Sequence, residues 1–444
     1  MNWSQLLSFQ RLGKDQPKPL QPGRSPFQQD FDRIIFSSAF RRLQDKTQVF
    51  PLAEHDYVRT RLTHSLEAAS IGRSLGAGAG VFICRHGDLA PLQPSDVGAI
   101  CAAASLGHDI GNPPFGHSGE EAIRHWFTHS AVAATLQQTM TEHECADFRR
   151  YEGNAQGFRV LARLQMPDNY GGMQLTCATL AAAAKYPYPG SANHKKFNFF
   201  QADRELFRLV AEATGMQPRA GEDFSWYRHP LAFLVEAADD ITYRIIDFED
   251  GHALKIIPYP EIERLFLAII DDGDTRNKVQ QLHDPERKVE MLRAKALGTL
   301  IDQIIKAFER HHDAILAGEL EQPLIHLIPA APVLAEILQR SIEEVYTFRR
   351  AVEIEAAGYE LTFGLLDTFV PALEEAAFGR ASDRSRKLLQ LLPKRYCPVD
   401  DPAWKGSSYL RLLMLLDYLA GMTDSYAVSL FKKIKGISLP GMMM

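Results

Sequence analysis

The stretch Ser105 to Glu121, SLGHDIGNPPFGHSGEE, collects side chains that could carry out chemistry. An apolar run, Ala99 to Leu106, leads into His108 and Asp109, and the residues Gly111 to Pro114 then prevent a helix from continuing. An imidazole and a carboxylate thus stand side by side at a predicted helix end. Both are metal ligands in proteins, so the pattern predicts one corner of a metal site.

A second pair of reactive side chains follows the prolines. His117 precedes Glu120 by three residues, and the pattern predicts a new helix here, with Ser118 as its cap and acidic residues in its first turn. The pair predicts acid–base chemistry beside the metal corner. The dipeptide His-Asp also occurs at residues 55, 283 and 312, but only the dipeptide at 108 precedes a helix stop and such a pair.

Two further ligand candidates lie on predicted helices elsewhere. His64 shares a helix face with Ala68 and Ile71, where a histidine is usually a core residue unless other ligands converge on it. In the helix predicted from Pro230 to Gly251, Asp239 lies on the apolar stripe. An unpaired buried carboxylate is costly, so Asp239 is a better ligand candidate than Asp240, which is turned toward Arg244.

A basic loop, YPYPGSANHKKF, separates two helical stretches. Its prolines and glycine exclude regular structure, and Lys185, Tyr186 and Lys196 lie in or beside it. By itself this composition fits a solvated loop and a phosphate clamp equally well.

Together His64, His108, Asp109 and Asp239 would offer two imidazoles and two carboxylates to a cation. This donor set suits one divalent ion, Mn²⁺ or Mg²⁺, with positions left open for water and substrate. Fe²⁺, Co²⁺ and Ni²⁺ stay open as alternatives, and zinc is less favoured because no cysteine is within reach.

Composition limits the class of protein. The chain has 444 residues, 45% of them hydrophobic and 23% charged, with a net charge of −6, which indicates a globular protein without a general affinity for polyanions. Its five cysteines show no CxxC spacing, so we expect a reducing, cytoplasmic location. No apolar run reaches the roughly 20 residues that cross a bilayer, so we expect no membrane partner.

Apolar residues recur with helical periodicity along most of the chain, for example between residues 297 and 308 and between 333 and 345. No useful alternating strand pattern occurs, so the predicted class is all-α. We expect an N-terminal arm at 1–27 without its own core, a catalytic helical core at 28–252 and a helical region at 253–444 packed on that core, all forming one large helical unit.

Several segments make the chain resemble the HD-domain phosphohydrolases, and within them the dGTPase-like deoxynucleoside triphosphate (dNTP) triphosphohydrolases. The matching segments are FRRLQDKTQVFPL from Phe40, RTRLTHSLE from Arg59, GHDIGNPPFGHSGEEAI from Gly107, EGNAQGFR from Glu152, EAADDITY from Glu236 and AGMTD from Ala420. They run from residue 40 to 424, so the resemblance covers most of the chain.

The resemblance implies the HD-domain fold and hydrolysis of a dNTP, with dGTP preferred, to deoxynucleoside and intact triphosphate. It assigns the metal to His64, His108, Asp109 and Asp239, and catalysis to His117 and Glu120. It places Gln48 near the base and the following residues in the substrate pocket: Arg61, Asn154, Lys185, Tyr186, Lys196 and Tyr243. It also implies a homo-oligomer, such as a hexamer, and a nucleotide or single-stranded DNA effector.

Two alternatives stay open. One is another HD-family hydrolysis, of an alarmone or a cyclic nucleotide, which needs the same four ligands. The other is a nucleotide sensor or single-strand binder without catalysis. His117 and Glu120 disfavour the sensor, because a binding protein does not need a general acid.

Overall fold

The computed structural model describes residues 1–16, 23–48, 59–86, 89–192 and 194–438. Within them the chain is helical and forms isolated β-bridges but no β-sheet, which confirms the all-α prediction. No helix in this part of the chain is long and apolar enough to cross a membrane. The first eleven helices are α1 (Trp3–Leu6), α2 (Pro26–Ile35), α3 (Ser38–Arg42), α4 (Arg61–His86), α5 (Pro94–Gly107), α6 (His117–His129), α7 (Ala131–Gln137), α8 (Glu142–Arg149), α9 (Gly153–Arg159), α10 (Cys177–Ala182) and α11 (Arg204–Thr214).

The second half of the chain continues in the same way. Its helices are α12 (Pro230–Ala253), α13 (Tyr259–Ile270), α14 (Gly273–Gln281), α15 (Pro285–Arg310), α16 (His312–Ala317), α17 (Ala331–Arg340), α18 (Arg349–Ala377), α19 (Asp383–Leu389), α20 (Pro402–Gly406), α21 (Ser408–Ala420) and α22 (Asp424–Ile434). Short turns of 3₁₀ or π-helix link some of them.

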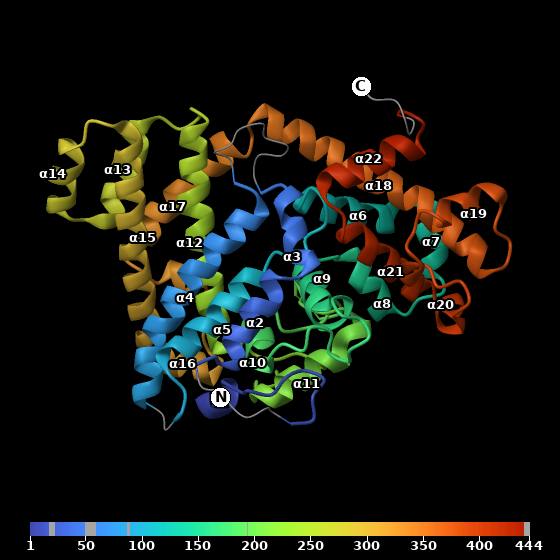
Figure 1. The fold of residues 1–444 in the computed structure, drawn as a ribbon, viewed down its shortest axis with the longest axis horizontal. Helices are drawn as coiled ribbons and strands as arrows, with labels where there is room; N and C mark the ends of the chain where they lie inside the picture. Colours follow the sequence, from blue (N-terminus) through green and yellow to red (C-terminus); the bar gives the residue numbers. More distant parts are fainter. Residues whose placement is uncertain (17–22, 49–58, 87–88, 193, 439–444) are drawn as a thin grey trace.

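The helices that carry the predicted ligands pack together at the centre. Helix α4 lies along α5, and α12 packs against both (Figure 1). Small residues on α4 permit this approach: a Cβ atom at Gly76 would lie 2.7 Å from the carbonyl oxygen of Val97 on α5. The close packing brings His64, near the start of α4, beside the end of α5, where His108 follows.

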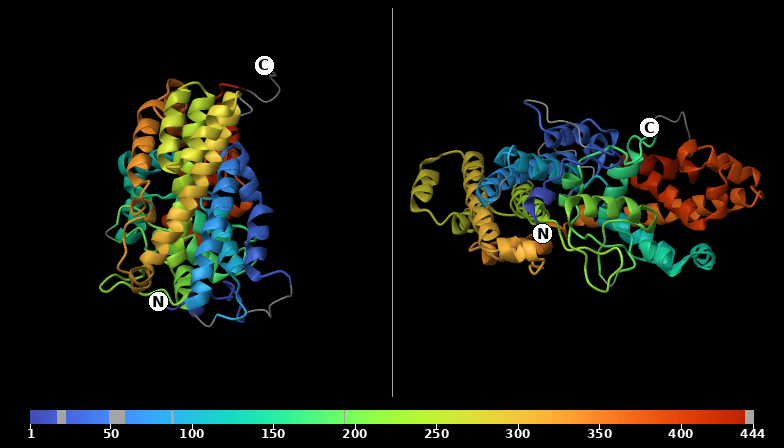
Figure 2. Two further views of the ribbon diagram at one scale, coloured as in Figure 1. Left: turned by 90° about the vertical axis from the view of Figure 1, so that its left-hand side faces the viewer. Right: turned by 90° about the horizontal axis from the view of Figure 1, so that it is seen from below.

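Three apolar clusters hold the remaining helices around this centre. The first joins α4, α5 and α12 to α13, α15 and α17. The second joins α6 to α8 with α18, α21 and α22, and the third joins α2, α3, α10 and α11. Figures 1 and 2 show α13, α14 and α15 at one end of the molecule and α19 and α20 at the other. Within the segment predicted as an arm, Trp3, Leu6 and Leu7 are buried in the first cluster.

Buried ion pairs and hydrogen bonds of charged side chains join distant parts of the chain. The guanidinium of Arg159 lies 3.0 Å from Asp203 and 2.7 Å from Asp417, and all three side chains are almost completely buried. The buried Lys46 ammonium donates to the carbonyl oxygens of Asn112, 2.5 Å away, and Ala420, 2.6 Å away. These contacts tie the C-terminal helices to the segment that follows His108.

Two predicted helix ends are wrong in detail. Ser118 does not cap α6, because the helix begins one residue earlier, at His117. Gly116, with φ of 55°, occupies the cap position, a conformation that glycine adopts without strain. Gly251 does not end α12, which continues to Ala253. This glycine is buried inside the helix, where a Cβ atom would lie 2.8 Å from the Val345 side chain, so its small size serves close packing.

Gly111 provides a test of this packing. A Cβ atom there would lie 2.0 Å from the backbone nitrogen of Gly157 and 2.3 Å from the carbonyl oxygen of Gly153, both in α9. We expect Gly111→Ala to lower the free energy of unfolding by about 3 kcal/mol, because backbone atoms cannot move aside as a flexible side chain can. Gly107→Ala is the control, since its nearest neighbour would be an ordinary 3.5 Å away. Urea denaturation measures both, and equal stabilities would contradict the packing described here.

Candidate active site

One cavity of about 380 Å³ lies where α4, α5, α6 and α12 meet. Every residue proposed for the site from the sequence lines it: Gln48, Arg61, His64, His108, Asp109, His117, Glu120, Asn154, Lys185, Tyr186, Lys196, Asp239 and Tyr243. Residues as far apart as 48 and 243 in the sequence therefore share one space. The roles that the resemblance gives them remain proposals.

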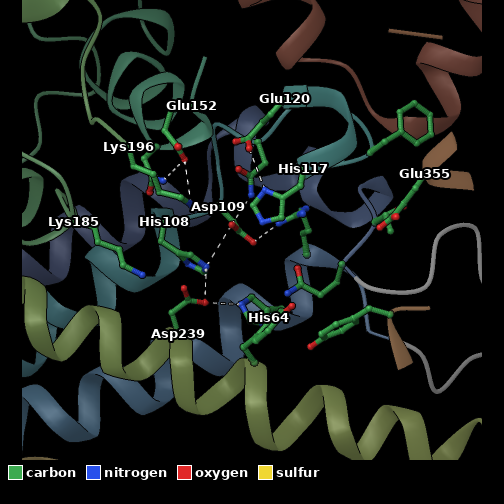
Figure 3. A pocket seen from close by; sticks show the side chains of 18 of the residues that line it. His64, His108, Asp109, His117, Glu120, Glu152, Lys185, Lys196, Asp239 and Glu355 are labelled. Carbon is green, nitrogen blue, oxygen red and sulfur yellow. Dashed lines mark hydrogen bonds and ion pairs between the residues drawn. The ribbon is translucent and has the colours of Figure 1, made fainter. Parts of the chain in front are cut away.

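Asp239 lies beside both imidazoles of the predicted metal corner. Its Oδ1 lies 3.2 Å from Nε2 of His64 and 3.3 Å from Nε2 of His108 (Figure 3). Oδ1 of Asp109 lies 3.5 Å from the same nitrogen of His108. His64, His108 and Asp109 form a group that could hold a metal ion, with one ligand atom of each within 4.8 Å of the others. Asp239, the fourth predicted ligand, is not a member of this group, although its Oδ1 lies beside both imidazoles.

The hydrogen bonds of His108 suit a metal ligand. Its Nδ1 donates to the carbonyl oxygen of Ser105 at 2.6 Å, which leaves Nε2 facing the cavity as a lone-pair donor. This buried nitrogen has no well-formed hydrogen bond among the described residues. Burial lowers the pKa of the imidazole, but the carboxylates of Asp109 and Asp239 outweigh it and raise the pKa to about 9. The two carboxylates therefore favour a positive charge at this position. A divalent cation would supply that charge, so the donor set fits a divalent cation.

Asp109 is held in place on its far side. The guanidinium of Arg61 donates to its Oδ2 at 2.7 Å, and the Asn112 amide donates to its Oδ1 at 2.5 Å. Burial alone would raise the pKa of Asp109, but Arg61 and His108 outweigh it and hold the pKa well below its usual range. The carboxylate is therefore ionised and oriented before any ligand arrives.

The His117 and Glu120 pair lies at the start of α6. Nδ1 of His117 lies 3.1 Å from Oε2 of Glu120, and the buried Glu120 also accepts from the backbone N–H of Gly153 at 2.7 Å. The hydrogen bond to Glu120 raises the pKa of the His117 imidazole. The His117 side chain is 84% exposed, so its ring can reach a ligand in the cavity. This geometry would suit a proton donor whose imidazole is held by a buried carboxylate.

The basic loop does line the cavity. The Lys185 ammonium pairs with Glu236 at 3.2 Å, and that of Lys196 lies 3.8 Å from Glu152. Each ammonium is 5.8 Å from the centre of the Tyr186 ring, so both cations interact with this ring. In the view of Figure 3, Lys185 and Lys196 lie on one side of the His108 and Asp109 corner and Glu355 lies on the other. This placement is compatible with a phosphate clamp, whose role here remains a proposal.

The orientation predicted for the two aspartates of α12 is confirmed. Asp239 faces the imidazoles, whereas Asp240 pairs with Arg244 at 3.8 Å and does not line the cavity. One turn beyond Asp239, the Tyr243 ring stacks on that of Tyr346, with centroids 5.5 Å apart. The buried Oε1 of Gln48 has no hydrogen-bond partner among the described residues, and Gln48 lines the same cavity.

The sequence reasoning missed seven lining residues: Thr47, Asn112, Phe115, Glu152, Tyr346, Ile354 and Glu355. Asn112 was interpreted only as part of a helix stop, and Glu152 stood in a quoted motif without a role. Asn112 lies close to His108 in the sequence and Glu152 lies close to Asn154, and this proximity to predicted site residues could have identified both. Tyr346, Ile354 and Glu355 carried no signal, because only tertiary packing brings this part of the chain to the cavity.

Comparison with known proteins agrees with this geometry. The HD domain family matches residues 61–148, which include His64, the His108 and Asp109 pair, and the His117 and Glu120 pair. A deoxyguanosinetriphosphate triphosphohydrolase-like protein of Synechocystis is 41% identical over 99% of this chain and 100% of its own length. One from Pseudomonas aeruginosa strain LESB58 is also 41% identical, with the same coverage. A deoxyguanosinetriphosphate triphosphohydrolase of Yersinia pseudotuberculosis is 30% identical over 92% of this chain and 93% of its own. The chain therefore belongs to the HD-domain family of deoxyguanosinetriphosphate triphosphohydrolases and their like proteins.

Proposed function

We propose that this protein is a metal-dependent dNTP triphosphohydrolase that releases deoxynucleoside and intact triphosphate and prefers dGTP. The observation that carries the proposal is the single cavity in which a metal corner, a histidine held by a carboxylate, and two lysines meet. The names of the relatives support the substrate class. The preference for dGTP rests on the resemblance alone.

In this proposal the triphosphate lies between the metal corner and the basic loop. A divalent cation, Mn²⁺ or Mg²⁺ in this proposal, would polarise the α-phosphate and acidify a water molecule. The residues that would hold it are His64, His108, Asp109 and Asp239. Lys185 and Lys196 bind the outer phosphates and offset the charge that develops during transfer. A water oxygen forms the new bond to the α-phosphorus and gives one proton to solvent, while the bond to the 5′ oxygen breaks. The 5′ oxygen is a poor leaving group without a proton.

His117 is positioned to supply that proton. The ring nitrogen opposite the one bound by Glu120 is directed away from the carboxylate and can donate to the leaving oxygen. Glu120, buried and fixed by the N–H of Gly153, stabilises the protonated ring before the transfer. After transfer, the neutral ring regains a proton from solvent, to which it is open.

The two lysines provide a prediction about binding. Lys185→Ala and Lys196→Ala each remove a charge-assisted bond to phosphate worth roughly 1.5–3 kcal/mol, so KM should rise about ten- to a hundredfold with metal content unchanged. Steady-state kinetics and metal analysis measure the two effects. Lys195→Ala is the matched control, because Lys195 does not line the cavity. A wild-type KM in both variants would show that the loop does not bind the phosphates and is only solvated.

A product analysis tests the reaction itself. Purified protein with Mg²⁺ or Mn²⁺ and each of the four dNTPs should yield deoxynucleoside and triphosphate, separated by ion-exchange chromatography, with dGTP consumed fastest. Pyrophosphate and nucleoside monophosphate would reject the proposal. Turnover of an alarmone or a cyclic nucleotide in place of dNTPs would favour the other HD chemistry, and binding without turnover would favour a sensor.

Further expectations rest on the resemblance. We propose a homo-oligomer, such as a hexamer, a nucleotide or single-stranded DNA effector, and a cytoplasmic location. Sedimentation velocity with and without nucleotide measures the assembly directly.

A further inference from the structure

A second cavity, of about 170 Å³, is lined in part by the basic loop. Tyr188 and His194 of the loop form one wall, the segment with Arg219 and Arg228 forms another, and Gly318 after α16 closes it. It shares no lining residue with the candidate active site. Neither the resemblance nor the proposed reaction gives it a role.

The two arginines of this cavity are held by aromatic rings. The Arg219 guanidinium lies 4.6 Å from the centre of the Tyr227 ring, and that of Arg228 lies 5.2 Å from the Phe233 ring. Stacking uses the face of a guanidinium and leaves the N–H groups at its edge for an anion. Arg219 has an ion pair at 3.6 Å with Glu321, but that carboxylate is 76% exposed, so the pair contributes little and is easily displaced.

Arg228 connects the second cavity to the active site. It donates to Oε2 of Glu236 at 2.7 Å, while Lys185 in the active site lies 3.2 Å from Oε1 of the same residue. The Glu236 side chain is only 4% exposed, so this buried carboxylate depends on its two cations. An anion that draws Arg228 away leaves Glu236 more dependent on Lys185.

We propose that the second cavity binds a small inorganic phosphate anion, and that its occupation weakens the hold of Lys185 on substrate. Arg219 and Arg228 both line this cavity, and a guanidinium group matches phosphate oxygens in geometry and charge. The cavity has less than half the volume of the active site, 170 against 380 Å³, so it suits a phosphate without a nucleoside. The binding site stands by itself, whereas the coupling rests on the proposed role of Lys185.

The coupling has a defined sign. Phosphate in the second cavity strengthens the ion pair between Lys185 and Glu236. Lys185 then binds the triphosphate more weakly, and the KM for substrate rises. Linkage requires the reverse effect as well: substrate bound to Lys185 leaves Glu236 with Arg228 and lowers the affinity for phosphate.

Calorimetric titration with inorganic phosphate, in Mg²⁺, tests the site without requiring turnover. Arg219→Gln should weaken one binding event roughly ten- to a hundredfold, because it removes the charge-assisted bonds of one guanidinium. Arg208→Gln, on the exposed face of α11, is the control and should bind as the wild type does. Wild-type affinity in Arg219→Gln would overturn the site, even if the protein hydrolyses dNTPs as proposed.

Kinetics with added phosphate then test the coupling. In the wild type, phosphate should raise the apparent KM in two ways, by competing with substrate in the active site and by binding in the second cavity. In Arg219→Gln only the competition in the active site remains, so the rise in KM should be smaller. Equal rises in both proteins, with binding lost in the variant, would overturn the coupling. If no dNTP is hydrolysed, the proposed function fails and the titration still decides the site.

Discussion

Asp239→Asn is expected to lose bound metal and nearly all activity, whereas Asp240→Asn is expected to stay close to the wild type. The two residues are neighbours on α12 and have the same side chain, so they form a matched pair. Oδ1 of Asp239 lies 3.2 and 3.3 Å from the two imidazoles, and a neutral amide cannot supply the charge that holds a cation there. Asp240 pairs with Arg244 and lies outside the cavity.

Metal content by elemental analysis and melting temperature with added Mn²⁺ measure this effect apart from turnover. Because the ion binds only the folded protein, it should stabilise the wild type by about 2.7 kcal/mol at a concentration a hundred times its Kd. His64→Ala, His108→Ala and Asp109→Ala should show little of that rise and little activity. Equal damage from Asp240→Asn would mean that the ligand on α12 has been assigned to the wrong residue.

His117→Ala is expected to keep the metal and still bind dNTP while kcat falls by about 10²–10⁴, the range for loss of a general acid. The ring of His117 is held by the buried Glu120 at 3.1 Å, a partner that suits a proton donor. Single-turnover kinetics and metal analysis on the same preparation separate chemistry from binding. Loss of metal from His117→Ala would make this residue a ligand, and the proton donor would have to be another group.

The pH dependence identifies the form of His117 that acts. Since the carboxylate of Glu120 raises the pKa of the imidazole, activity that needs the protonated ring is present below that pKa and is lost as the pH rises through it. Glu120→Gln removes the charge, so the alkaline limb of the kcat profile should move to lower pH, with a smaller loss at low pH. An unchanged profile would show that the pair does not set the protonation of the ring.

The sequence by itself determined the all-α class and the distinction between Asp239 and Asp240. Both follow from local rules, because apolar residues with a 3.6-residue period define a helix and its buried face. A rotation of about 100° per residue then places neighbouring aspartates on different sides of α12. The helix stop near His108 is local in the same sense, because Pro113 and Pro114 lack a backbone N–H and disfavour a continuing helix.

Tertiary structure alone decided which side chains meet. His64 on α4 was a core histidine by its own pattern, and it faces the metal corner because close packing of α4 on α5 and α12 brings it beside His108 and Asp239. The sequence pattern around Lys185 and Lys196 fits solvent and phosphate equally well, and only the tertiary structure places both side chains at the cavity. Tyr346 and Glu355 reach the site from a part of the chain that no local rule connects to it. Local patterns set the angle of a side chain about its own helix, but its neighbours depend on how separate helices pack, and that packing is a property of the whole chain.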